Sequence, residues 1–211
     1  MKTKIALIVL CVALVVFLAM SAKVIDKGTE GQYTGEVAFD AGASSSGDWD
    51  AVVSEITSNA QDIASMDLSA LGDGKAVTLK GTVTAFESKA NGKKNSITVA
   101  PEGYSGDAVF TVQLGSIYSG TAVRDVQTVK RFGNFTNQTE WSQYAKALNG
   151  QLHELVVAPL AIDAGIQGKT VTVTGAATGS AANVDITPVA IAIERDGRAL
   201  YVRRSERSAP L

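Results

Sequence analysis

The sequence has a single cysteine, Cys11, and a single histidine, His153. One cysteine excludes an intrachain disulfide and a cysteine-based metal site, and one histidine excludes a site built from several imidazoles. The sequence also lacks a phosphate-binding loop, a dinucleotide-binding glycine motif and a strand-turn-helix serine motif. We therefore expect no cofactor and no catalytic metal, and the apolar residues around His153 indicate an ordinary packed or surface histidine.

Charged residues are missing from residues 5–22, a run of eighteen. A membrane-spanning helix needs about 17–25 residues, whereas the apolar core of a cleaved signal peptide has roughly 7–15. We interpret residues 1–22 as an uncleaved signal anchor in the cytoplasmic membrane, with cleavage near Met20 as the alternative. Lys2 and Lys4 precede the run, which predicts the N-terminus inside and the folded part outside, on the periplasmic side.

The exported part has no excess of positive charge. Removing Lys2 and Lys4 from the 19 basic residues leaves 17 against 21 acidic residues, a net charge of −4. Nucleic acid is held largely by basic side chains on its phosphates. We therefore expect no nucleic-acid partner.

Few large apolar residues occur in residues 23–47, which end in AGASSSG. We predict a tether there, with room for one short strand at residues 35–39. Asp48 is a candidate helix cap, and apolar residues then recur at helical spacing. The sequence therefore predicts a small helical domain over residues 48–73.

The barrel is predicted from alternating apolar and polar residues, a pattern typical of strands with one buried face. A helix is predicted at residues 137–149, between the third and fourth of these strands, and Asn149-Gly150 is expected to end it. The five strands are predicted at residues 74–86, 96–100, 108–114, 170–175 and 185–194, with an appended strand at 198–204. Three strands, a helix and two strands are the order of the OB-fold, a five-stranded Greek-key barrel.

The predicted fold class is therefore mainly β with α. It consists of an OB-like five-stranded Greek-key barrel over residues 74–205 plus a small helical domain, preceded by an N-terminal membrane helix. Residues 206–211 form a tail.

Residues 120–141, GTAVRDVQTVKRFGNFTNQTEW, form the stretch richest in polar and aromatic side chains. They connect the third predicted strand to the helix across one end of the barrel, and a long connection needs internal hydrogen bonds. We interpret the stretch as mainly structural, with Arg124 and Asp125 pairing with backbone groups or remote charges. We expect Phe132 and Phe135 to plug the bottom of the barrel.

The end of this stretch predicts a helix start. Asn137 is followed three residues later by Glu140, as in a capping box, and Gln138 lies at the first helical position. A binding surface remains the alternative interpretation of the whole stretch, because loops on rigid scaffolds often carry function.

A family resemblance rests on this stretch and on three short segments after it. The pattern is GTAxRD, then two phenylalanines, then Asn-Gln, and it continues in Ala147-Leu148-Asn149, Gly168-Lys169 and Thr187-Pro188-Val189. It resembles the bacterial domain-of-unknown-function family described as predicted periplasmic lipoproteins, over about residues 22–195. Where that family often has a lipobox cysteine, this chain has Ala22, which cannot be lipidated.

The resemblance implies a small helical domain beside an OB-like barrel on the outer side of the cytoplasmic membrane. Members of the family are commonly encoded beside sugar ABC transporters, so the resemblance also implies a transport-associated role. It implies no catalytic activity.

Our leading hypothesis is a membrane-tethered extracytoplasmic accessory or binding protein for a carbohydrate ABC transporter. It would bind a protein partner or a sugar-containing ligand on the second and third strands and the loop at residues 87–95. An envelope-carbohydrate hydrolase is the alternative, using a carboxylate pair that the sequence does not single out. Single-strand nucleic-acid binding is a third hypothesis, and it needs stacked aromatic side chains in a basic groove.

Overall fold

The computed structural model describes residues 38–195 and 198–201. The chain divides into two units, residues 1–40 and residues 41–211. The predicted signal anchor, residues 1–22, lies outside the described residues. Among the residues that are described, no helix is long and apolar enough to cross a membrane.

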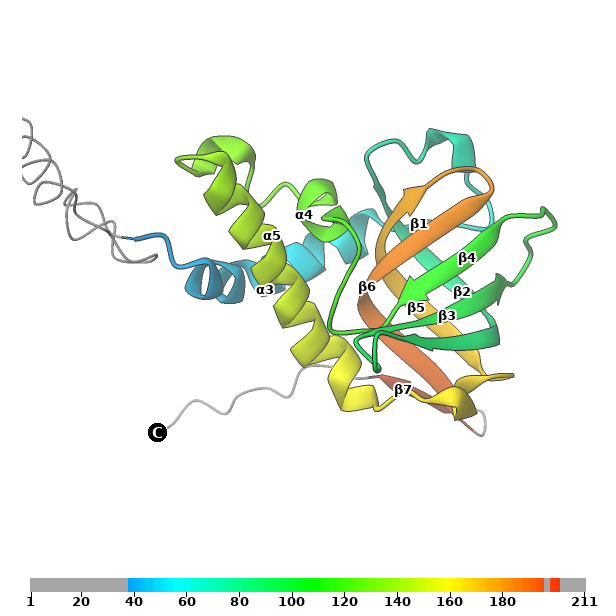
Figure 1. Ribbon diagram of the computed structural model, residues 1–211. Coiled ribbons are helices and arrows are strands. Elements are labelled where there is room, and N and C mark those ends of the chain that lie inside the picture. Colours follow the sequence, from blue (N-terminus) through cyan, green and yellow to red (C-terminus); the bar gives the residue numbers. More distant parts are fainter. Residues whose placement is uncertain (1–37, 196–197, 202–211) are drawn as a thin grey trace, which may run out of the picture. The chain divides into compact units, whose positions relative to one another are not determined.

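A closed five-stranded barrel forms the larger part of this unit (Figure 1). Around the barrel the strand order is β2-β3-β4-β6-β5, and β5 pairs again with β2. Neighbouring strands are antiparallel except β4 and β6, which are parallel. The barrel strands are β2 (Lys75–Lys89), β3 (Lys94–Pro101), β4 (Val109–Gln113), β5 (Thr170–Gly179) and β6 (Asn183–Arg195). The predicted order of strands is confirmed, and β2 is joined to β3 by a tight turn in which residues 91 and 92 both have positive φ.

Closure depends on two glycines where strands bend. Gly81 pairs with Val171 of β5 and with Pro101 of β3, so β2 changes partner at this residue. A side chain at Gly81 would overlap the carbonyl oxygen of Ala100, and one at Gly175 would overlap that of Thr187. The backbones approach so closely at both points that only glycine fits.

The barrel interior is filled by the apolar positions of the alternating pattern. These side chains are small and branched for the most part, as suits a narrow barrel, and nearly all are fully buried. They include Val77, Leu79, Val83, Ile97, Val99, Phe110, Val112, Val171, Val173, Ile186 and Ile191.

Two long helices lie beside the barrel, and α5 crosses α3 in Figure 1. The first, α3 (Ala41–Asn59), contacts β2, β5 and β6, and the second, α5 (Gln138–Leu152), contacts α3. Because α3 packs directly on the strands, it belongs to the same compact unit as the barrel. Two short strands complete the sheet: β1 (Gln61–Asp62) pairs with β2, and β7 (Arg198–Tyr201) pairs with β6.

The helical segment begins earlier and ends earlier than the sequence predicts. The tether was expected to reach residue 47, yet AGASSSG forms the first turns of α3, and residues 60–73 are not part of the helix. Ser45 is fully buried there and donates a hydrogen bond to the carbonyl of Gly42 at 3.1 Å. Burial thus stabilises a helix whose residues have low intrinsic helix propensity. Asp48 lies within the helix and does not cap it.

The far end of α5 also differs from the prediction. Asn149-Gly150 does not end the helix, which continues to Leu152 and then widens into a π-helical turn, η3 (His153–Val157). Leu148 and Leu152 are completely buried, so packing carries the helix past the glycine.

Candidate functional site

The segment of residues 120–136 joins β4 to α5, and we call it the crossing segment. Its first part is a short helix, α4 (Ala122–Val126), whose residues Ala122 and Val123 are buried and which contacts β5 and β6. Its second part contains a 3-10 turn, η2 (Phe132–Asn134). Apolar anchoring of α4 fixes the position from which Arg124 and Asp125 extend.

Arg124 and Asp125 form a tight ion pair. The Nε and Nη2 atoms of Arg124 donate to Oδ1 of Asp125 at 2.8 and 2.6 Å. Thr121 donates through Oγ1 to the other carboxylate oxygen, Oδ2, at 2.5 Å. The side chains are only 12% and 30% exposed, so water screens the pair weakly.

The guanidinium of Arg124 also lies over an aromatic ring. Its Cζ atom is 4.5 Å from the centroid of Trp141, on α5. This distance is that of a cation-π contact, which is more favourable when the cation is shielded from water. Arg124 therefore joins α4 to α5 through Trp141, and it also neutralises Asp125.

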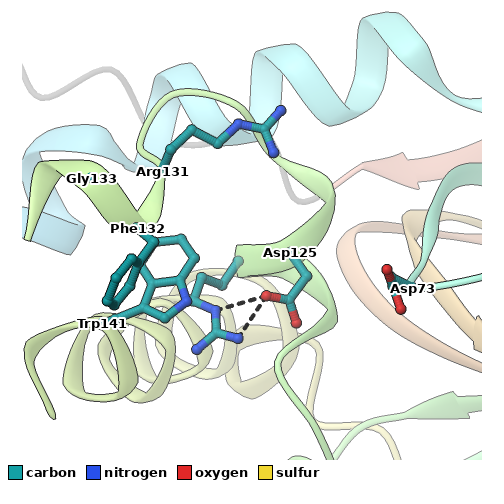
Figure 2. Close-up of a pocket in the computed structure, with 7 residues that line it drawn as sticks. Asp73, Asp125, Arg131, Phe132, Gly133 and Trp141 are labelled. Atoms are coloured by element: carbon teal, nitrogen blue, oxygen red, sulfur yellow. Dashed lines mark hydrogen bonds and ion pairs between the residues drawn. The ribbon is translucent and has the colours of Figure 1, made fainter. Parts of the chain in front are cut away.

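A hollow of about 560 Å³ opens beside this cluster, and we call it the crossing hollow (Figure 2). Figure 2 shows the rings of Phe132 and Trp141 on one side, Asp125 and Asp73 on the other, and Arg131 above. Its volume lies within the range of small-ligand sites, roughly 300–1,000 Å³. The lining residues are Asp73, Arg124, Asp125, Arg131, Phe132, Gly133 and Trp141.

The middle of the crossing segment is held by Gln127, which is completely buried. Its amide nitrogen donates to the carbonyls of Arg124 and Lys130 at 3.0 and 2.6 Å, and its amide oxygen accepts from the Lys130 N–H at 2.9 Å. One side chain thus satisfies three backbone groups that the connection would otherwise bury unpaired. Gln127 was not predicted to be important, because nothing in its neighbours marks a glutamine as buried.

Side chains of helix α3 also bind the middle of the crossing segment. Glu55 accepts from the backbone N–H of Thr128 at 2.9 and 2.8 Å, and also from its hydroxyl. Lys130 reaches Asp48 at 2.8 Å and donates to Ser44 at 2.7 Å. The loop that carries Arg131 and Phe132 is therefore fastened to α3 at two points.

Tyr144 completes this contact between α3 and α5. Its hydroxyl donates to Asp48 at 3.0 Å, and the side chain is completely buried. Burial raises the pKa of Tyr144 above its ordinary value, and the hydrogen bond to Asp48 and the negative charge of Asp48 raise the pKa further.

The structure changes the role assigned to the two phenylalanines. Phe132 is 50% exposed, whereas a residue that plugs the barrel would be buried. Its ring contacts that of Trp141 edge-on, with 6.4 Å between the ring centroids. Phe135 packs against Trp141 and Tyr144 of α5, each at 5.1 Å between ring centroids. Both rings belong to the helical layer, because η2 lies close to the start of α5.

The predicted helix start is confirmed at Asn137, whose side chain accepts from the Glu140 N–H at 3.0 Å. Glu140 departs from the expected box, because its carboxylate accepts from the N–H of Thr136 at 2.8 Å. Gln138 is the first residue of α5 and is exposed.

Among the six candidate residues, the structure brings Arg124, Asp125 and Phe132 to one hollow. Asn137 and Gln138 start the helix, and they are not among the residues that line it. Asp73 and Arg131 line the hollow and were not singled out. Asp73 lies about fifty residues before the crossing segment, so no local pattern could have paired them.

The second and third barrel strands, expected to carry a binding face, offer little to an aromatic ligand. These strands are β3 and β4; β3 has no aromatic residue, and the one aromatic residue of β4, Phe110, is buried inside the barrel. The loop at residues 87–95, expected to be part of the same face, carries an exposed ion pair, Lys89 with Glu87 at 2.6 Å. The stacked aromatic side chains that single-strand nucleic-acid binding requires are therefore missing from these two strands.

His153 lies at the start of the π-helical turn, with its ring 6.5 Å from that of Tyr118. Its Nδ1 and the Tyr118 hydroxyl are buried atoms without a hydrogen-bond partner in the described part of the chain. Burial raises the pKa of Tyr118. No group of three or more His, Cys, Asp or Glu side chains that could hold a metal occurs among the residues described.

Comparison with known proteins agrees with this architecture. The family model of predicted periplasmic lipoproteins, DUF2291, matches residues 69–192, which is more than half of the chain. The chain therefore belongs to this family. The match contains every residue that lines the crossing hollow and excludes α3. The family description agrees with the extracytoplasmic location expected from the sequence.

A solved structure supports the fold. The chain is similar to an OB-fold protein from Thermotoga maritima MSB8, with 14% identity and a TM-score of 0.52. The similarity covers 74% of this chain and 99% of that one. At this identity the similarity establishes the fold alone. No curated protein matches the chain.

Proposed function

We propose that this protein is a membrane-tethered extracytoplasmic binding protein that serves a carbohydrate ABC transporter, and that the crossing hollow is its contact site. The family description, predicted periplasmic lipoproteins, supports a location outside the cytoplasm. A role in sugar transport is suggested by the resemblance to proteins commonly encoded beside sugar ABC transporters. The observation that carries the proposal is the convergence of charged and aromatic side chains on one hollow of about 560 Å³.

The hollow suits binding because one ion pair and the backbone of one loop in its wall are already positioned. Arg124 and Asp125 are fixed by each other, by Thr121 and by Trp141. The loop with Arg131 and Phe132 is fixed by Gln127 and by α3. A site that is ordered before its ligand arrives loses less conformational entropy on binding.

Photo-crosslinking in cells tests this proposal. A photoreactive phenylalanine analogue replaces Phe132, which is 50% exposed in the hollow, or Ile117, which is 47% exposed elsewhere. We expect a transporter component or a glycan to be trapped at position 132 and not at position 117. Equal trapping at both positions, or none at 132, would contradict the proposal.

One observation favours the hydrolase alternative: Asp73 and Asp125 line the same hollow. Glycosidases use two carboxyl groups, one of which must carry a proton to the leaving group. Both oxygens of Asp125 accept hydrogen bonds from Arg124 and Thr121, which commits them as acceptors. We therefore favour binding over hydrolysis.

The two functions are separated by a turnover assay. The full-length protein is incubated with envelope glycans, and the products are measured alongside those of Asp73→Asn and Asp125→Asn. We expect no turnover by any of the three proteins. Turnover by the parent, abolished in one folded variant, would establish the hydrolase.

A further inference from the structure

The crossing hollow contains one donor-only group, the guanidinium of Arg131, and one acceptor-only group, the carboxylate of Asp73. The guanidinium of Arg131 and the carboxylate of Asp73 form no ion pair among the described residues, and both side chains are exposed. Both line the hollow together with Phe132. The ligand chemistry follows from what these two groups can exchange with it.

A guanidinium can only donate hydrogen bonds, and an ionised carboxylate can only accept them. A carboxylate or phosphate ligand would pair with Arg131 and be repelled by Asp73. An ammonium ligand would pair with Asp73 and be repelled by Arg131. A hydroxyl group both donates and accepts, so a ligand with several hydroxyls satisfies both side chains.

The net charge of the hollow also favours an uncharged ligand with hydroxyl groups. Arg124 and Asp125 neutralise each other at 2.6 Å, and Arg131 and Asp73 add one charge of each sign. The sum over these four groups is zero. A neutral ligand therefore meets no net repulsion, whereas a ligand whose charges are all of one sign meets one like charge.

The remaining surface is an aromatic ring. Phe132 is half-exposed, while Trp141 has Arg124 over its ring and other aromatic rings beside it. Phe132 is thus the most exposed aromatic ring of the hollow, on the side away from Asp73 in Figure 2. A ligand that covers this ring needs an apolar side of its own.

We infer that the ligand of the crossing hollow is a neutral sugar, with a face of C–H groups on Phe132 and hydroxyls shared between Arg131 and Asp73. This inference rests on the proposed function. It narrows the ligand from a protein partner or any sugar-containing molecule to an uncharged sugar. Arg124 and Asp125 form a rigid surface beside the sugar. Phe132, Arg131 and Asp73 each contact the sugar.

Binding measurements on the full-length protein test the inference. The probes are D-ribose, D-xylose, D-glucose and D-galactose as neutral sugars, and D-glucuronate and ribose 5-phosphate as charged ones. We expect at least one neutral sugar to bind at least tenfold more tightly than either charged probe. We also expect its Kd to change less than twofold between 50 and 500 mM salt, because no net charge is neutralised.

Three substitutions test whether these residues bind the sugar. Asp73→Asn and Arg131→Gln should each weaken neutral-sugar binding about tenfold, and Phe132→Ala should weaken it by a similar factor. Asp107→Asn and Lys93→Gln, exposed residues outside the hollow, serve as matched controls and should leave the Kd unchanged. Unchanged thermal unfolding would show that each variant is folded.

The outcomes are distinguishable. If a charged probe binds most tightly, and Asp73→Asn strengthens its binding while Arg131→Gln abolishes it, the ligand is anionic; the inference then fails and the proposed function stands. If no sugar binds but position 132 traps a protein, the inference also fails and the proposed function stands. If neither binding nor trapping occurs at the hollow, both fail.

Discussion

The barrel and the crossing segment are held together in different ways. Barrel strands hold each other by continuous backbone pairing, from Lys75 of β2 to the far end of β6, around a core of small apolar side chains. The crossing segment has one short helix and one 3-10 turn, and side chains satisfy much of its backbone. The barrel can therefore tolerate changes to outward side chains, whereas the crossing segment depends on single residues.

The largest effect should come from breaking the barrel where its backbones meet. Gly81→Val places a side chain on the carbonyl of Ala100, so we expect a loss of about 3 kcal/mol or more in the free energy of unfolding. Gly47→Ala in α3, where nothing lies within 4 Å, should instead raise it by roughly 0.5–1 kcal/mol. Urea denaturation measures both, and similar effects at the two glycines would contradict the explanation.

The crossing segment should be most sensitive at Gln127. Gln127→Leu keeps the size of the side chain but leaves three backbone groups of Arg124 and Lys130 unpaired. We expect a loss of about 2–4 kcal/mol in denaturation experiments. The same substitution at Gln167, which is exposed, should change stability by less than about 0.5 kcal/mol. A small loss at Gln127 would mean that the segment is held by its apolar contacts.

A smaller loss is expected from the ion pair. Arg124→Ala or Asp125→Ala should each cost about 1–3 kcal/mol, because each leaves a poorly screened charge without its partner. The double variant should lose less than the sum of the two single variants, since both remove the same contact. Variants that unfold like the parent but no longer bind at the hollow would show that the pair is a binding group and not a structural one.

The smallest effect concerns Tyr144 and appears at high pH. Its pKa is raised in the folded protein, so folding keeps it neutral while the unfolded chain ionises. The stability that this provides is complete below the ordinary pKa of 10.0 and is lost as the pH rises above it. Tyr144→Phe should cost about 1 kcal/mol at pH 8, from the lost bond to Asp48, and should flatten the decline above pH 10. An unchanged decline would assign it to Tyr118 or to other groups.

The difference between the barrel and the crossing segment also explains which features could be predicted from the sequence. In a barrel strand every second side chain points into the core. The alternation at Val77, Leu79 and Val83 therefore locates β2 without knowledge of its neighbouring strands. The cap at Asn137 is equally local. The start of α3 was missed because small residues such as Ser45 have low helix propensity and gain their order from burial.

The crossing hollow could be predicted only in part. Arg124 and Asp125 are neighbours in the chain, so their pairing was within reach of the sequence. Asp73 and Trp141 meet them through the fold, and the clamps from Glu55 and Asp48 span more than seventy residues. Contacts of this kind have no period, which is why the role expected for Phe132 and Phe135 was wrong.

The two clamps on α3 have a mechanical consequence. Ser44 and Glu55 hold the same loop from positions eleven residues apart, about 16 Å along the helix axis. Because α3 binds the loop at two separated points, the helix cannot tilt without moving the loop. A tilt of α3 would therefore move the loop that carries Arg131 and Phe132, and with it one wall of the crossing hollow.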